Sequence, residues 1–194
     1  MCLDNYPKET ARYDTRGEGM ASTGKILDRI AKAAYDNDRA YEGCARCVLA
    51  ALQEHVHLLH DDKAYRAALK ASTPLAAGVA RRGETCGALI GAIMAVGLVA
   101  GSERLDDAEG YVRAMEVAVE VFDRFKNNYG TVKCFEIQEK LFGRHYDFFN
   151  PEDAEAWYKD NGLDKCPGVC AVAARIGAEV ILELRERKRM KKDE

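Results

Sequence analysis

The sequence predicts an all-α protein that folds as a single-domain helical bundle. Apolar residues recur at spacings of three and four behind good N-cap residues, and no segment alternates convincingly between apolar and polar residues. The uncharged stretch from Cys86 to Ser102 is rich in glycine and alanine, which is typical of a buried helix that neighbours approach closely. With 194 residues, 47% of them hydrophobic, the chain is long enough for one sizeable core.

Residues 1–21 lack a periodic apolar face and are expected to be irregular, whereas residues 22–194 are expected to form the helical domain. The expected helices, each with its start signal, are these: about 23–35 after Ser22 or Thr23; 38–56 after Asn37 or Asp38; 62–70 after Asp61; 86–101 after Thr85; 107–129 after Asp106 or Asp107; 132–142 after Thr131; a short helix after Pro151; and a last helix over about 169–184. Asn127-Asn128-Tyr129-Gly130 ends the fifth of them. Its apolar stripe is expected to consist of Val112, Met115, Val119, Phe122 and Phe125.

Composition excludes several classes of function. A formal charge of -3 and a pI near 5.9 give no reason to expect binding to nucleic acid. The longest uncharged run is too short and too rich in glycine for a membrane span, and the polar start resembles no signal peptide. The expectation is a soluble cytoplasmic protein with no membrane association.

Seven cysteines are the unusual feature of such a protein. In a reducing compartment, metal binding or redox chemistry is a better explanation for them than structural disulfides. The expected caps place Cys86, Cys134 and Cys166 near helix N-termini, where free N–H groups and the helix dipole stabilise thiolates, and Cys44 one or two turns into its helix. Only a bundle in which these helix ends converge could make one site of the four.

Two close pairs add to the count. Cys44 with Cys47, and Cys166 with Cys170, each share a helix face and could supply neighbouring ligands or a dithiol. Val48 stands where covalent haem attachment needs histidine, and the spacings match neither ferredoxin runs nor zinc fingers.

Four blocks carry a resemblance to a known family: Gly43-Cys44-Ala45, Gly83-Glu84-Thr85-Cys86-Gly87-Ala88-Leu89-Ile90-Gly91-Ala92, Tyr129-Gly130-Thr131-Val132-Lys133-Cys134, and Cys166-Pro167. In these blocks and their order, from about residue 24 to residue 183, the chain resembles the redox-active C_GCAxxG_C_C proteins. The resemblance implies a small helical redox module that holds a prosthetic group through Cys44, Cys86, Cys134 and Cys166, related to the iron–sulfur domain of split-Soret cytochrome c. Cys2, Cys47 and Cys170 are additional to that pattern.

We therefore expect an iron–sulfur protein for electron transfer or redox sensing, with a 2Fe-2S or 4Fe-4S cluster held by these four cysteines. Cys47 and Cys170 are expected to be core residues beside the site more often than ligands. Two alternatives stay open: a metal-free thiol–disulfide oxidoreductase that uses Cys44/Cys47 or Cys166/Cys170, and a structural or interaction protein with a zinc staple. The expected partners are a redox protein and, through the glycine-rich helix, a second copy in a homodimer.

Other candidate residues have weaker signals. Arg81 and Arg82 could balance a negatively charged cluster, but a solvated loop explains them equally well. His55, His57 and His60 are expected to lie at a solvated helix end, and His145 has even less support as a metal ligand. Four aromatic residues are expected to pack against one another or to shield the site: Phe148, Phe149, Trp157 and Tyr158.

Overall fold

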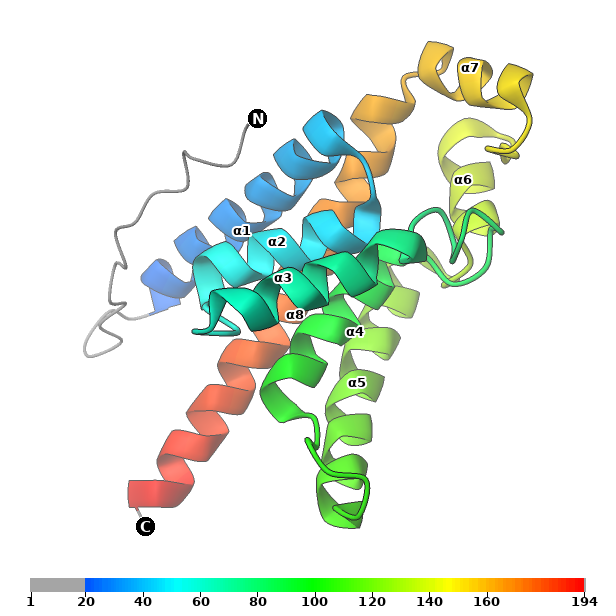
Figure 1. Ribbon diagram of the computed structural model, residues 1–194. Coiled ribbons are helices and arrows are strands. Elements are labelled where there is room, and N and C mark those ends of the chain that lie inside the picture. Colours follow the sequence, from blue (N-terminus) through cyan, green and yellow to red (C-terminus); the bar gives the residue numbers. More distant parts are fainter. Residues whose placement is uncertain (1–19, 194) are drawn as a thin grey trace.

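The computed structural model describes residues 20–193, and within them the chain is all-α, which confirms the predicted fold class (Figure 1). The elements are α1 (Met20–Tyr41), α2 (Cys44–Val56), α3 (Asp62–Ser72), a 3₁₀ turn η1 (Thr73–Leu75), α4 (Gly87–Ala100), α5 (Ala108–Tyr129), α6 (Cys134–Phe142), α7 (Pro151–Lys159) and α8 (Gly162–Asp193). Each helix of this part of the chain is too short or too polar to traverse a bilayer.

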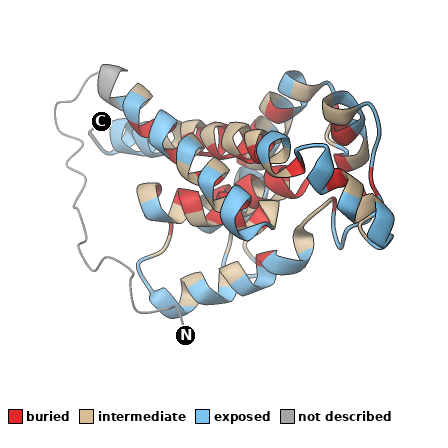
Figure 2. Cartoon of the chain, turned by 90° about the horizontal axis from the view of Figure 1, so that it is seen from above, coloured by how far each residue is buried: buried red, intermediate tan, exposed pale blue. Residues whose placement is uncertain are grey.

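The glycine-rich helix α4 lies at the centre of the bundle. It packs against α2, α5 and α8, while α1 lies along α8. Because α4 is apolar on all sides, its first ten residues are largely buried, whereas Gly97 and Leu98 near its end are exposed. Figure 2 shows the buried positions gathered where these helices meet and the exposed positions on the outer faces.

The boundary between the first two helices differs from the prediction. Helix α1 continues to Tyr41, past the expected caps Asn37 and Asp38, and α2 begins at Cys44. The chain reverses instead at Glu42 and Gly43, whose φ angles are 53° and 94°. The left-handed geometry at Gly43 suits a residue without a Cβ, so the break falls on the glycine. Cys44 therefore starts α2 and does not lie one or two turns inside it.

The caps of α5 were predicted correctly, but its buried face was not. Asp107 caps its start through the Gly110 N–H, and Gly130 ends it in the left-handed conformation. The buried face carries Val117, Val121 and Phe125, while three members of the predicted stripe are exposed: Val112, Met115 and Val119. Both rows have helical spacing, and α5 buries the row that faces α4 and α8.

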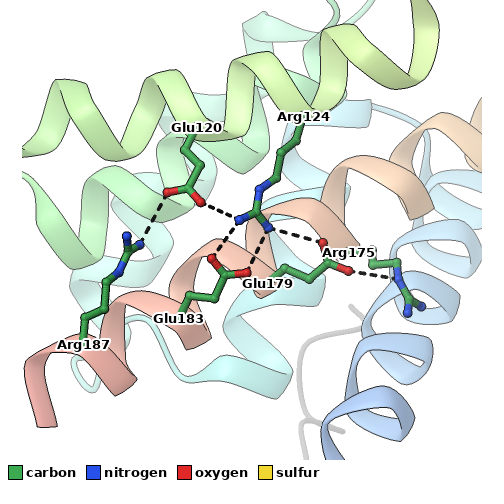
Figure 3. A network of polar contacts seen from close by, with 6 residues as sticks. All are labelled: Glu120, Arg124, Arg175, Glu179, Glu183 and Arg187. Atoms are coloured by element: carbon green, nitrogen blue, oxygen red, sulfur yellow. Dashed lines mark hydrogen bonds and ion pairs between the residues drawn. The ribbon is translucent and has the colours of Figure 1, made fainter. Parts of the chain in front are cut away.

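Charged residues fasten α5 to the long helix α8 (Figure 3). Arg124 of α5 donates two hydrogen bonds to Glu183 at 3.1 and 2.8 Å, and it also pairs with Glu120 and Glu179. Arg175 extends the network to Asp28 of α1 at 2.6 Å. Arg124 thus holds three carboxylates in a partly buried position.

We expect Arg124→Met to lower the free energy of unfolding by about 1 kcal/mol, since partly exposed pairs are individually weak but three share this guanidinium. Urea denaturation measures the change. The matched control is Arg113→Met on the same helix, where one exposed pair with Glu109 spans 3.6 Å. The difference between the two variants should shrink in 1 M salt; equal effects of both variants would contradict the role given to the network.

Candidate metal centre

Five cysteines line one cavity of about 730 Å³, which lies where the starts of α2, α4 and α6 meet the second turn of α8. They are Cys44, Cys86, Cys134, Cys166 and Cys170, and all five are free thiols. Cys47 is buried but does not line the cavity, and Cys2 lies outside the described residues. The cavity thus brings together the four cysteines singled out in the sequence, with Cys170 as a fifth.

A short antiparallel clip places Cys86 beside Cys134. Thr85 and Lys133 form a β-bridge, in which the Cys86 N–H donates to the Val132 carbonyl at 2.8 Å and the Cys134 N–H to the Glu84 carbonyl at 2.6 Å. The two segments that lead into α4 and α6 are therefore tied together, and both helices start at the same place. Because Thr85 belongs to this bridge, the prediction that it caps α4 is wrong, and Cys86 is the N-cap residue.

The start of α6 is a second departure from the expected caps. Its N-cap is Lys133, and Thr131 acts one step further back, accepting a bond from the Lys133 N–H at 3.2 Å. The Thr131 hydroxyl also donates to the Glu136 carboxylate. Cys134 is the first residue of α6, so it does lie in the first turn as expected, although the helix begins two residues later than the expected start.

The glycines of the Cys86-Gly87-Ala88-x-x-Gly91 block let α4 approach α2 closely. A Cβ at Gly87 would lie 2.4 Å from Cys44 Sγ and 2.6 Å from the Leu75 carbonyl oxygen, and one at Gly91 would lie 2.4 Å from the Ala45 carbonyl oxygen. No real Cβ tolerates such contacts. Gly87 therefore makes room for a sulfur, and Gly91 makes room for the backbone that carries it.

Helix α8 contributes the last two thiols. It begins at Gly162, earlier than predicted, so Cys166 lies in its second turn and Pro167 inside the helix. The side chain of Cys170, one turn further on, is buried and lies 4.0 Å from the Cys44 carbonyl oxygen. The last helix was expected to begin near residue 169, and it begins about two turns earlier, because Asn161, with a φ of 62°, ends the connection from α7.

A left-handed segment forms another part of the wall. The φ angles of Ala77, Gly78, Val79, Ala80 and Arg81 are all positive, between 49° and 73°. Backbone hydrogen bonds hold the segment, including Ala80 N–H to Pro74 O at 2.8 Å and Glu84 N–H to Gly78 O at 3.0 Å. Each non-glycine residue in this conformation costs about 1 to 2 kcal/mol. Strain of this kind persists where the surroundings impose it, and it clusters at functional sites.

The thiols are held in a protonated state when no metal is bound. Burial raises the pKa of the Cys86 thiol to about 12, with a further contribution from Cys134, while the N–H groups of Ala88 and Leu89 at the start of α4 lower it. Burial likewise raises the pKa of Cys134 to about 12, and Cys44 adds to the rise. The same cause raises the pKa of Cys44, Cys166 and Cys170.

Two buried polar residues at the cavity were missed by sequence reasoning. The Gln138 side chain donates from Nε2 to Cys134 Sγ at 3.5 Å, and its carbonyl oxygen accepts from the Tyr146 N–H at 3.0 Å. The spacing of four between Cys134 and Gln138 on one helix could have revealed this contact. Asp38 faces the thiols of Cys47 and Cys170, and burial raises its pKa to about 6. The sequence suggested only that Asp38 caps a helix, as Asn37 beside it could, and gave no sign that it faces cysteines.

The far wall of the cavity is aromatic and carries arginines. Phe148, Phe149 and Trp157 line it, together with Arg46 and Arg81. Arg82 does not line the cavity but lies over the Phe149 ring, 4.8 Å from its centroid. The four histidines do not line it either; His145 stacks on Phe135 at 4.5 Å between ring centroids.

The donor set fits a soft metal, although no three His, Cys, Asp or Glu side chains of residues 20–193 are arranged around one point as for a single bound ion. Five thiols face one cavity whose volume exceeds that of one ion, and thiolates select iron–sulfur clusters, zinc or copper(I). A metal replaces the thiol protons outright, which removes the obstacle that the high pKa values present. Cys44, Cys86, Cys134 and Cys166 would hold such a group.

These observations define a class of small helical proteins in which several thiols line one cavity. A family model described as "Putative redox-active protein (C_GCAxxG_C_C)" matches residues 42–180, which is more than half of the chain. The chain therefore belongs to the C_GCAxxG_C_C family, as its cysteine and glycine blocks predicted. No curated protein and no solved structure matches it significantly.

Proposed function

We propose that the protein binds an iron–sulfur cluster through Cys44, Cys86, Cys134 and Cys166 and acts in electron transfer or redox sensing. The observation that carries the proposal is the meeting of these four thiols, from four different helices, on the wall of one cavity. The family's description supports a redox role. A cluster would supply reversible one-electron chemistry at this site.

The size of the cavity favours a cluster over the zinc staple. Four thiolates around one zinc ion, each about 2.3 Å from it, leave no cavity between them. The thiols here line one part of a cavity of about 730 Å³, which leaves room for several inorganic atoms beside them. In a cluster the cysteines are shared among several iron atoms, so their sulfur atoms stand further apart than around one zinc ion.

The thiol environment disfavours the metal-free oxidoreductase. Such an enzyme needs a thiol that is ionised near neutral pH, whereas burial raises the pKa of every cysteine at the cavity. Cys47, the other half of the Cys44/Cys47 pair, has a pKa raised to about 12, again mainly by burial. Its thiol donates to the Glu42 carbonyl at 3.3 Å and lies off the cavity.

The protein itself would fix the ligands and set the potential of the site. The N–H groups of Ala88 and Leu89 face the Cys86 sulfur, the Ala77 N–H faces the Cys44 sulfur, and the Gln138 amide donates to Cys134. Hydrogen bonds to sulfur stabilise negative charge there and so favour the reduced state. Arg46 and Arg81 bring positive charge to the same cavity.

The setting we propose is cytoplasmic, with a redox protein as partner. A homodimer through the glycine-rich helix has less support, because Gly87 and Gly91 are needed for the close packing of α4 inside one chain. Size measurement in solution tests the dimer.

Purification without oxygen tests the central proposal. The protein is expected to be brown and to contain iron together with acid-labile sulfide, before or after reconstitution with iron and sulfide. A colourless protein that stays free of iron after reconstitution would contradict it. Stoichiometric zinc without a redox response would favour the zinc staple instead.

The Gln138 amide gives a finer prediction about the potential. Gln138→Leu removes the donor to Cys134 Sγ, so the midpoint potential of the loaded protein is expected to fall. A difference of about 1 kcal/mol between oxidation states corresponds to roughly 40 mV for one electron.

Potentiometric titration followed by absorbance measures this shift. The matched control is Gln53→Leu, which removes a glutamine whose amide binds the Leu59 backbone away from the cavity. An unchanged potential in Gln138→Leu, or an equal shift in the control, would show that the amide does not act on the site.

A further inference from the structure

Aromatic side chains are exposed around the opening of the cysteine cavity. Tyr41 lines the cavity from the end of α1 and is 70% exposed, and Phe149 lines it from the connection to α7 and is 58% exposed. Tyr158 of α7 is 49% exposed, and its hydroxyl donates at 2.7 Å to the carboxylate of Glu42, the residue after Tyr41. Exposed aromatic residues that gather at one place among polar residues are typical of protein interaction sites.

Three arginines at the same opening form no ion pair within residues 20–193. Arg46 and Arg81 donate to backbone carbonyl oxygens, at 2.9 and 3.5 Å, and Arg82 lies over the Phe149 ring, 4.8 Å from its centroid. Most of the other arginines in this part of the chain pair with a carboxylate, as Arg124 does. The three guanidinium groups therefore keep a positive charge that no adjacent carboxylate neutralises.

Negative charge at the opening is smaller. Among the described residues, two carboxylates line the cavity, those of Asp38 and Glu42. Asp38 is only 8% exposed and faces buried thiols, so it presents little charge to a molecule outside. The three arginines thus outweigh the single exposed carboxylate of Glu42, and the opening favours a partner with negative charge.

We propose that this opening is the docking surface for a small redox protein with an acidic face. We refer to it as the mouth surface, which consists of Tyr41, Arg46, Arg81, Arg82, Phe149 and Tyr158. Carboxylates of the partner would supply the ion pairs that the three arginines lack, and the aromatic rings would form the dry centre of the contact. The inference deepens the proposed function and rests on it, because a partner docked here lies over the proposed cluster. One electron would pass between the two cofactors, with no bond formed or broken.

The position of the mouth surface favours a redox protein over a nucleic acid. A polymer of phosphates finds a more basic site at the end of α8, where six of the eight residues 185–192 are Lys or Arg. That end lies at the opposite end of the bundle from α6 and α7 (Figure 1), about 30 Å along the helix axis from Cys170. A partner that exchanges electrons has to dock beside the thiols, and there the surface combines arginine with aromatic residues, as protein interfaces do.

Binding of a flavodoxin, a small acidic flavoprotein, tests the inference. Titrated calorimetrically into the anaerobically purified full chain at low ionic strength, it is expected to bind in a saturable way, and more weakly as salt is added. The double variant Arg81→Gln/Arg82→Gln should weaken the binding about tenfold, because it removes two of the three unpaired charges.

The matched control is Lys191→Gln/Lys192→Gln, which removes the same number of charges from the exposed far end of α8. It should bind flavodoxin as the wild type does. A second pair of variants tests the aromatic part: Phe149→Ala should weaken binding, whereas Tyr111→Ala, 62% exposed on α5 and away from the cavity, should not. No saturable binding by the wild type, or equal weakening in a variant and its control, would overturn the inference.

Two further measurements separate the remaining explanations. A 20-base-pair DNA duplex that binds more tightly than flavodoxin, and that Arg81→Gln/Arg82→Gln releases, would show a nucleic-acid surface and overturn the inference. Iron and sulfide are measured on the same samples. Flavodoxin binding with the expected variant pattern in a protein without iron would keep the mouth surface and reject the cluster, whereas iron-loaded protein that does not bind would reject the mouth surface alone.

Discussion

Cys86→Ser and Cys134→Ser are each expected to lose most of the iron that the anaerobically purified protein binds. The β-bridge between Thr85 and Lys133 holds the segments that carry these two thiols side by side at the wall of the cavity. Serine is a poor ligand for the soft metals that thiolates select. Colorimetric iron and sulfide assays, normalised to folded protein by circular dichroism, measure the loss.

Cys47→Ser is the matched control, because Cys47 is as buried as the proposed ligands but lies off the cavity. It should keep its iron. Cys170→Ser distinguishes the two thiols of α8: the family pattern predicts Cys166 as the ligand, so Cys170→Ser should also keep its iron. Retention of full iron content by Cys86→Ser or Cys134→Ser would refute the ligand set.

Gly91→Ala is expected to destabilise the fold, and Gly97→Ala is expected to stabilise it, although the two substitutions are identical in chemistry and lie on one helix. A Cβ at Gly91 would meet the Ala45 carbonyl oxygen at 2.4 Å, so α2 and α4 would have to move apart. Overpacking of this kind costs about 1 to 3 kcal/mol. That cost exceeds the gain of up to about 1 kcal/mol from the better helix propensity of alanine.

At Gly97 nothing lies within 4 Å of the added Cβ, so only the propensity gain of about 0.5 to 1 kcal/mol remains. Urea denaturation of both variants, read as changes in the unfolding midpoint at constant slope, gives the two signs. A neutral or stabilising Gly91→Ala would show that the approach of α4 to α2 is looser than 2.4 Å implies.

The sequence predicted those features of the fold that depend on residues close together in the chain, such as the ends of helices. Asp107 and Gly130 fixed the ends of α5 because a cap and a left-handed glycine act within one turn. The uncharged run predicted α4 as a buried helix because no face of it could be left in water. The family's cysteine pattern then named four residues that do line one cavity.

Contacts between distant segments were beyond such signals. The clip that joins Thr85 to Lys133 pairs residues 48 positions apart in the sequence, and neither residue marks a strand. The buried row of α5 was misread because two rows of the helix are apolar and only α4 and α8 decide between them. Asp38 and Gln138 became part of the site only when α1 and α6 packed beside the thiols.

The left-handed segment at residues 77–81 reverses a common rule of protein engineering. Glycine normally weakens a helical turn, but at Ala80, with a φ of 52°, it would release about 1 to 2 kcal/mol of strain against an entropy cost of about 0.5 to 1 kcal/mol. Ala80→Gly should therefore raise the melting temperature. Because Ala80 also lines the cavity, the strained backbone that lowers the stability of the fold is part of the wall that shapes the site.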